Sequence, residues 1–211
     1  MIIAIDGPAG AGKSTVARRL AERLGFRYLD TGAMYRALTW LAIRDGVPLD
    51  KGARLGSLAE NHPVDFDERG RVFISGVDVT AAIRRTDIDR MVPVVARHSE
   101  VRSVMRGRQR ELGHIGNAVI EGRDIGTVVA PDAEVKVYLE ADPEVRARRR
   151  QTERPDIGAD ALATDLRLRD ESDAARMQPA ADAVQIDTTV LEVEQVVDVV
   201  ERLVRERTPA R

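Results

Sequence analysis

The sequence predicts an α/β fold in which a parallel five-stranded sheet carries helices on both faces. Three observations support this class: short apolar runs recur along the chain, helical segments separate them, and a glycine-rich loop joins the first run to the first helical segment. Short apolar runs are typical of strands buried on both faces, and parallel strands are joined by crossovers that are usually helices. The predicted strands lie at residues 2–5, 26–29, 119–120, 135–139 and 183–186.

The loop after the first run reads Gly7-Pro8-Ala9-Gly10-Ala11-Gly12-Lys13-Ser14 and fits the phosphate-binding pattern G-x-x-x-x-G-K-[ST]. Glycines let the backbone wrap around phosphate oxygens, and the N–H groups of the turn and the next helix point at the anion. We expect Lys13 to reach the outer phosphates and the Ser14 hydroxyl to ligate Mg²⁺. The loop therefore predicts a bound nucleoside triphosphate.

Several helices have recognisable ends. The first carries apolar residues at helical spacing up to Leu24 and is expected to stop at Gly25. Asp142 is expected to cap a helix that begins at Pro143. An apolar stripe from Val193 to Val204 predicts a last helix, and another from Val95 to Leu112 predicts one helix that ends at Gly113.

Two segments depart from the alternating pattern. Residues 62–80 have short alternating runs on either side of the turn Asp67-Glu68-Arg69-Gly70, which predicts a small antiparallel insertion. The segment from Arg146 to Thr164 is arginine-rich and contains Pro155 and Gly158. It predicts a helix that passes into a short mobile loop.

Composition excludes several classes of protein. A length of 211 residues with 43% hydrophobic residues suits one domain with a core, and a net charge of −2 gives no reason to expect binding to nucleic acid or membranes. There is no cysteine for a disulfide or a thiolate zinc site, and the three histidines lack metal-ligand spacing. With no charged leader and no stretch of 18 apolar residues, we expect a cytoplasmic protein.

Arginines gather at or just beyond the predicted strand ends, at positions 36, 123, 169 and 176. One triphosphate does not need so many, whereas a second phosphate in the same site would, because guanidinium groups can neutralise two anions that repel each other. Exposed arginines that pair with nearby acids are the alternative reading. A phosphate monoester is largely dianionic at neutral pH and needs no general base as an acceptor. This fits the lack of a Ser-His-Asp or Cys-His arrangement in the sequence.

With these motifs in view, the chain resembles the bacterial cytidylate kinases, which are phosphate-loop nucleoside monophosphate kinases, over nearly its whole length. The resemblance is carried in order by Ile5 to Thr15, Asp30-Thr31-Gly32-Ala33-Met34-Tyr35-Arg36, Val101-Arg102 with Arg108-Gln109-Arg110, Glu121-Gly122-Arg123-Asp124-Ile125-Gly126-Thr127-Val128-Val129, Arg169-Asp170 with Asp173 and Arg176, and Ala181-Asp182-Ala183.

The resemblance implies transfer of the ATP γ-phosphoryl group to CMP or dCMP with Mg²⁺. Lys13 and the arginines at 36, 123 and 176 are implied as catalytic residues. ATP is implied to bind residues 7–15, namely Gly7, Pro8, Ala9, Gly10, Ala11, Gly12, Lys13, Ser14 and Thr15. The implied CMP residues are Arg36, Arg123 and Arg176 for the phosphate, Arg102 and Asp124 for the cytosine edge, and Arg169 and Asp173 for the sugar. Ser14 and, through water, Glu121 are implied at Mg²⁺.

The same resemblance divides the expected single kinase domain, 1–211, into three parts. The core is expected at 1–45, 114–145 and 180–211. A monophosphate-binding subdomain that contains the β insertion is expected at about 46–113, and a short lid at about 146–179. We expect a monomer that acts on small molecules. The chain departs from the family pattern at Pro93, where a serine usually contacts the base, and in the shortened lid and 176–179 segment.

Two alternatives stay open at this point. Another small phosphate-loop kinase would act on UMP, AMP or an alcohol, and an alcohol acceptor would need a positioned carboxylate base. A GTPase-type switch would need an N-K-x-D element, but Asn61 and Asn117 are the only asparagines and neither precedes a lysine.

Overall fold

The structure of the chain is a computed structural model that describes residues 1–155 and 157–207. Contacts divide the chain into two compact units, residues 1–28 with 116–211 and residues 29–115. Asp156, inside the predicted lid, and residues 208–211 lie outside the described residues. Among the helices of the described ranges, none combines the length and the apolar character that crossing a membrane requires.

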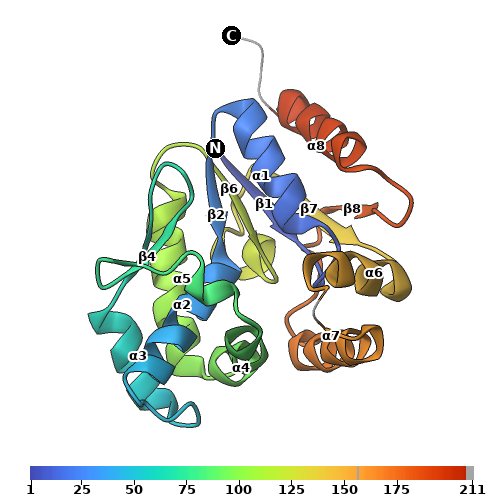
Figure 1. Cartoon of the computed structure of the whole chain (residues 1–211). Coiled ribbons are helices and arrows are strands. Elements are labelled where there is room, and N and C mark those ends of the chain that lie inside the picture. Colours follow the sequence, from blue (N-terminus) through green and yellow to red (C-terminus); the bar gives the residue numbers. More distant parts are fainter. Residues whose placement is uncertain (156, 208–211) are drawn as a thin grey trace. The chain divides into compact units, whose positions relative to one another are not determined.

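The main sheet has five strands in the order β2-β6-β1-β7-β8 (Figure 1). The pairs β1–β6, β1–β7 and β7–β8 are parallel, and Ile3 at the centre lies opposite Val119 and Val135. The parallel α/β fold is therefore confirmed. The strands span Ile2–Asp6 (β1), Arg27–Asp30 (β2), Ala118–Gly122 (β6), Val135–Glu140 (β7) and Val184–Asp187 (β8).

Two helices of the first unit, α1 (Lys13–Leu24) and α8 (Val193–Arg207), lie side by side and share one apolar core with the sheet (Figure 1). The core forms because both helices place apolar residues at helical spacing: Val16 and Leu20 from α1, Val197 and Val200 from α8. Both predicted helices are confirmed. Gly25 ends α1 with a φ of 65°, as expected for a left-handed C-terminal residue.

Helix α6 (Pro143–Glu153) begins as predicted, because the Asp142 side chain accepts a hydrogen bond from the Glu144 N–H at 2.8 Å. Of the residues that the structure describes after α6, residues 154, 155, 157 and 158 are not helical, and α7 (Ala159–Asp173) follows. The predicted loop was expected to extend to Thr164. This boundary is wrong, because Thr164 lies inside α7. Helix α7 was missed because it is mostly polar, and in its first ten residues only Leu162 and Leu166 are buried.

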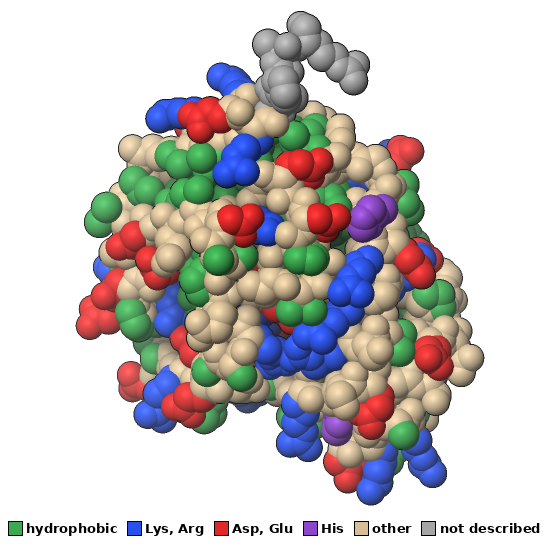
Figure 2. Space-filling view, turned by 180° about the vertical axis from the view of Figure 1, so that it is seen from behind, with side chains coloured by type: hydrophobic (Ala, Val, Ile, Leu, Met, Phe, Trp, Pro, Cys, Tyr) green, Lys and Arg blue, Asp and Glu red, His purple; other side chains and the backbone are tan. Residues whose placement is uncertain are grey.

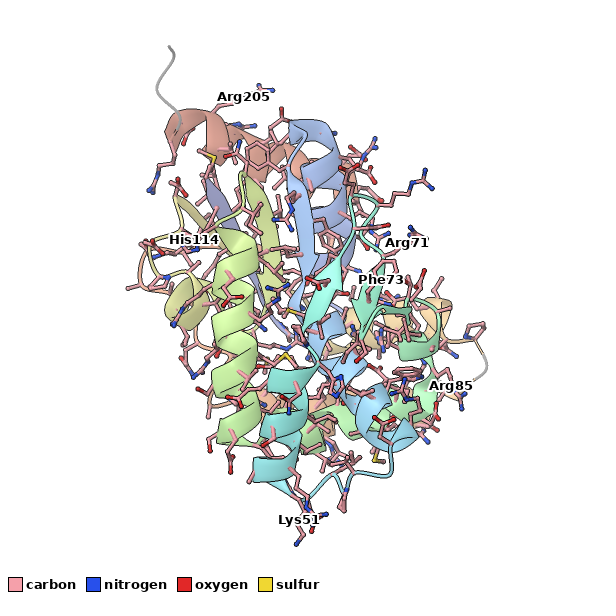
Figure 3. All side chains as sticks on the ribbon, turned by 90° about the vertical axis from the view of Figure 1, so that its left-hand side faces the viewer. Lys51, Arg71, Phe73, Arg85, His114 and Arg205 are labelled. Carbon is pink, nitrogen blue, oxygen red and sulfur yellow. The ribbon has the colours of Figure 1, made fainter. Side chains whose placement is uncertain are left out.

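The second unit holds the small antiparallel sheet β3 (Val64–Phe66), β4 (Val72–Ile74) and β5 (Val77–Asp78). This confirms the predicted insertion. Its turn is held by Asp67, which accepts hydrogen bonds from the N–H groups of Arg69 and Arg71 at 3.0 and 2.8 Å. The Arg71 guanidinium also lies 5.4 Å from the centroid of the Phe73 ring (Figure 3).

The helices of this unit are α2 (Thr31–Arg44), α3 (Gly52–Asn61), α4 (Thr86–Ala96) and α5 (Ser99–Gly113), with a short 3-10 turn, η1 (Ala82–Arg84). Helix α2 belongs here by its contacts with α4, η1 and β4, although the sequence-based division assigns residues 31–45 to the core. The single helix predicted from Val95 to Leu112 is wrong, because the backbone becomes extended at His98 and Val95 therefore belongs to α4.

Candidate active site

The loop between β1 and α1 is shaped by glycines that no other residue can replace without strain. Gly7 has a φ of 144° and Gly10 a φ of 80°, both outside the range that L side chains favour. A Cβ at Gly7 would lie 2.0 Å from the carbonyl oxygen of Leu139, and one at Gly10 would lie 2.9 Å from that of Arg146. The loop is thus pressed against β7 and α6.

Lys13 is the first residue of α1 and is buried, and its Nζ donates to the Pro8 carbonyl at 2.8 Å. Burial holds the pKa of Lys13 well below its ordinary value, and the charges of Arg123 and Arg169 lower it further against the opposing effect of Glu121. All these groups belong to the first unit. A polyanion at the loop would reverse this balance, because negative charge favours the protonated amine.

Ser14 and Glu121 form a small oxygen cluster beside the loop. The Ser14 hydroxyl donates to Glu121 Oε2 at 2.9 Å, and the Tyr28 hydroxyl donates to Oε1 of the same carboxylate. Glu121 is buried at the end of β6, whereas Ser14 is exposed. A hydroxyl and a carboxylate are the hard oxygen donors that Mg²⁺ prefers, so the residues fit that ion.

Within the residues that the structure describes, no group of three or more histidines, cysteines or carboxylates could hold a metal. An ion at Ser14 would therefore take its remaining ligands from phosphates and water, as is usual for Mg²⁺ in phosphoryl-transfer sites.

Arg123 and Arg176 share one carboxylate. Arg123 Nε donates to Asp173 Oδ2 at 3.0 Å, and Arg176 Nη2 donates to Oδ1 at 2.6 Å. Arg123 Nη1 also donates to the Gly7 carbonyl at 3.0 Å, which ties this cluster to the phosphate-binding loop. Two of the three implied phosphate-binding arginines are thus brought together, and one buried aspartate neutralises half of their charge.

Asp124 opens a π-helical turn, η2 (Ile125–Val129), that had no predicted counterpart. Its carbonyl accepts from the N–H groups of Val128 and Val129 at 2.9 and 3.2 Å. The turn is anchored by Asp6, whose carboxylate accepts from the N–H groups of Ile125 and Gly126 at 2.9 and 2.8 Å. Burial raises the pKa of Asp6, although these hydrogen bonds oppose the rise.

In the second unit, Arg36 lies on α2 between two carboxylates. Its Nε donates to Asp89 Oδ1 at 3.2 Å, and its Nη1 lies 3.6 Å from Asp30 Oδ2. Asp30 also caps α2 by accepting from the Ala33 N–H at 2.8 Å, and Arg84 donates to it at 2.8 Å. Burial acts to raise the pKa of Asp30, but the charges of Arg36 and Arg84 outweigh it and the pKa is lowered.

Arg102 lies in the first turn of α5, where its N–H donates to the His98 carbonyl at 3.1 Å. Pro93 lies inside α4 and has no N–H to give, although its carbonyl accepts from Arg97 at 3.2 Å. Arg102 and Arg36 belong to the second unit, while all the other implied site residues belong to the first.

Sequence reasoning assigned no role to four residues around the site: Asp6, Tyr28, Arg149 and Thr188. Thr188 is buried. Its hydroxyl lies 3.0 Å from the Ala11 carbonyl oxygen and accepts a hydrogen bond from Arg149 Nη1 at 3.0 Å. A buried acid at the end of an apolar strand was the available signal for Asp6. The others carry no local pattern, because their partners are more than 35 residues away.

Comparison with known proteins identifies the family. The family model described as Cytidylate kinase matches residues 3–206. A "Cytidylate kinase" of Shouchella clausii is 48% identical over 98% of this chain and 96% of its own, and one of Bacillus subtilis is 42% identical over 98% and 97%. A solved shikimate kinase of Bacteroides thetaiotaomicron covers 97% of this chain and 98% of its own at 15% identity, with a TM-score of 0.52.

The distant structural likeness shows a shared fold alone, whereas the family match rests on nearly the whole sequence. The family match agrees with the site described above, in which the glycine loop, the buried Lys13 and the pair Arg123 and Arg176 all belong to the first unit. The chain belongs to the cytidylate kinase family.

Proposed function

We propose that the protein transfers the γ-phosphoryl group of ATP to CMP and dCMP in a reaction that requires Mg²⁺. Family membership supports the reaction class. The observation that carries the proposal is the pairing of Arg123 and Arg176 on Asp173 next to Gly7, because it sets a second cationic site beside the phosphate-binding loop. A switch protein that binds one nucleotide has no need of that second site.

In the proposed reaction an oxygen of the CMP phosphate attacks the γ-phosphorus while the bond to the ADP oxygen breaks. The loop N–H groups and Lys13 stabilise the charge on the transferring group. Ser14 and Glu121 would hold Mg²⁺, and the ion would supply charge neutralisation at the phosphate oxygens. Arg36, Arg123 and Arg176 bind the acceptor phosphate. Because that phosphate is already a dianion, no side chain has to remove a proton.

Cytosine recognition is assigned to Arg102 and Asp124, and the sugar to Arg169 and Asp173. A carboxylate accepts from the cytosine amino group, and a guanidinium donates to N3 or O2. Uracil offers a carbonyl where cytosine has the amino group, so Asp124 would repel it. Pro93 lacks the hydroxyl that a serine would offer, so base selection rests on these two side chains.

An ADP-release assay with CMP, dCMP, UMP, AMP and shikimate tests the proposal. We expect CMP and dCMP to stimulate ADP release in the presence of Mg²⁺ and the other acceptors to give little. Stimulation by UMP, AMP or shikimate without CMP would contradict the proposal in favour of another phosphate-loop kinase. Removal of Mg²⁺ with a chelator should abolish turnover with CMP.

We propose that the protein is a cytoplasmic monomer that acts on small molecules. Side chains of both charges occur across the face shown in Figure 2, which fits the near balance of 33 basic and 35 acidic residues and favours neither nucleic acid nor a membrane as partner. Sedimentation analysis at working concentration is expected to give a mass near 23.3 kDa. A stable dimer would contradict this part of the proposal.

A further inference from the structure

Arg146 joins the phosphate-binding loop to helix α6. Its side chain is buried, and Nη1 donates to the Ala9 carbonyl at 3.1 Å. A Cβ placed on Gly10 would meet both the Cβ and the carbonyl oxygen of Arg146 at 2.9 Å. The first turns of α6 therefore rest directly on the loop, with no space between the two backbones.

The same guanidinium reaches helix α7. Arg146 Nη2 donates to Asp170 Oδ2 at 2.7 Å, and Asp170 is 26% exposed in its side chain. Asp170 directly follows Arg169 and lies one helical turn before Asp173, which pairs with Arg123 and Arg176. One side chain thus connects the loop with the helix that carries Arg169 and Asp173, two of the five implied CMP residues of the first unit.

Packing alone does not explain an arginine at this place. Within the described residues, Arg146 Nε is buried and has no hydrogen-bond partner, which carries a desolvation cost. Replacing a buried ion pair by an apolar side chain of similar size is often neutral or stabilising. The presence of an arginine with an unsatisfied buried nitrogen at this place therefore points to a role for its two directed hydrogen bonds.

We propose that Arg146 is a positioning residue that couples occupancy of the phosphate-binding loop to the position of α7. A nucleotide held by the loop fixes the position of the Ala9 carbonyl. Arg146 is hydrogen-bonded to that carbonyl and to Asp170, so it fixes the position of α7 in turn. Helix α7 then holds Asp173 and Arg169 in place for the acceptor. The coupling is reciprocal, so CMP tightens nucleotide binding by the same factor. This inference rests on the proposed function.

The test measures CMP affinity by calorimetry with and without a non-hydrolysable ATP analogue and Mg²⁺. In the wild-type protein we expect the analogue to tighten CMP binding by about tenfold, within the usual range of coupling between two sites. In Arg146→Met and in Asp170→Asn the factor should fall to about 2 or less, and the double variant should match the single ones. Arg148→Met, on the exposed side of the same helix, should keep the wild-type factor.

Several outcomes would overturn the inference. A wild-type factor near 1, wild-type coupling in a folded Arg146→Met, or additive effects in the double variant would each contradict it. If Arg146→Met does not fold, Arg146→Lys and Asp170→Asn decide the question, and lysine should restore part of the factor. A wild-type protein that gives no CMP-dependent ADP release refutes the proposed function itself, whereas failure of coupling in an active enzyme refutes the role of Arg146 alone.

Discussion

The phosphate-binding loop is built from backbone, whereas the arginine sites of both units are built from side chains. In the loop, Gly7, Gly10 and Gly12 have positive φ, so the loop depends on backbone conformations that glycine adopts without strain. At the arginine sites, guanidinium groups pair with Asp173 in one unit and with Asp30 and Asp89 in the other. Each arginine site therefore carries its own carboxylates, whereas the loop is shaped by its backbone and meets the Glu121 carboxylate through the Ser14 hydroxyl.

This difference teaches that the two kinds of site should fail in different ways. A backbone site depends on conformation, so changes that disturb it should damage both binding and stability. A side-chain site depends on charge, and its internal carboxylates keep the protein folded when a ligand or one arginine is removed.

The largest effect is expected from Lys13→Ala. Loss of the amine removes charge stabilisation from the transferring phosphoryl group, and turnover should fall by about a thousandfold. Stability should not fall, because the buried amine has a desolvation cost of its own. Steady-state kinetics and thermal unfolding test this, and near-normal turnover would exclude the assigned role.

Gly7→Ala is the next largest change, and it tests the backbone site. A methyl group at this φ would lie 2.0 Å from the Leu139 carbonyl, so we expect a loss of about 3 kcal/mol in the free energy of unfolding. Gly107→Ala is the matched control, because that glycine lies inside α5 with open space around it. The control should stabilise the protein by about 0.5–1 kcal/mol.

Arg123→Ala tests the side-chain site. We expect kcat/KM for CMP to fall by about a hundredfold, because a charge-assisted contact to phosphate is lost, while nucleotide affinity at the loop changes by much less. Asp173 keeps Arg176 as a partner, so the variant should fold. Equal losses for CMP and ATP would show instead that Arg123 serves the triphosphate or the loop through Gly7.

The smallest effect is expected from Asp30→Asn. The pKa of Asp30 is lowered in the folded protein from its ordinary 3.8, so its charge stabilises the fold above that pH and the contribution is lost as the pH falls further. At pH 7 the variant should be less stable by about 1–2 kcal/mol. The difference should shrink below about pH 4, as measured by urea unfolding at a series of pH values. A difference independent of pH would show that the charge is not involved.

Sequence patterns predicted the elements that depend on local spacing. The glycine loop, the Asp142 cap, the end of α1 at Gly25, the antiparallel insertion and the stripe of α8 follow from residues within a few positions of one another, and all agree with the structure. Helix α7 escaped prediction because it is largely polar and has few buried positions. The break at His98 was not predicted, because the apolar residues of α4 and α5 together fit the spacing of one continuous helix.

The residues of the loop and the arginines of the candidate site were determined by the sequence alone, since the loop pattern and the clusters after strand ends are local. Their partners were decided only by the tertiary structure: Asp173 shared by Arg123 and Arg176, Glu121 held by Ser14 and Tyr28, Asp6 on η2, and Arg146 between Ala9 and Asp170. The physical reason is that these hydrogen bonds, except the one between Arg176 and Asp173, join residues that are far apart in the chain. Neither spacing nor composition carries information about which strands and helices bring such residues together.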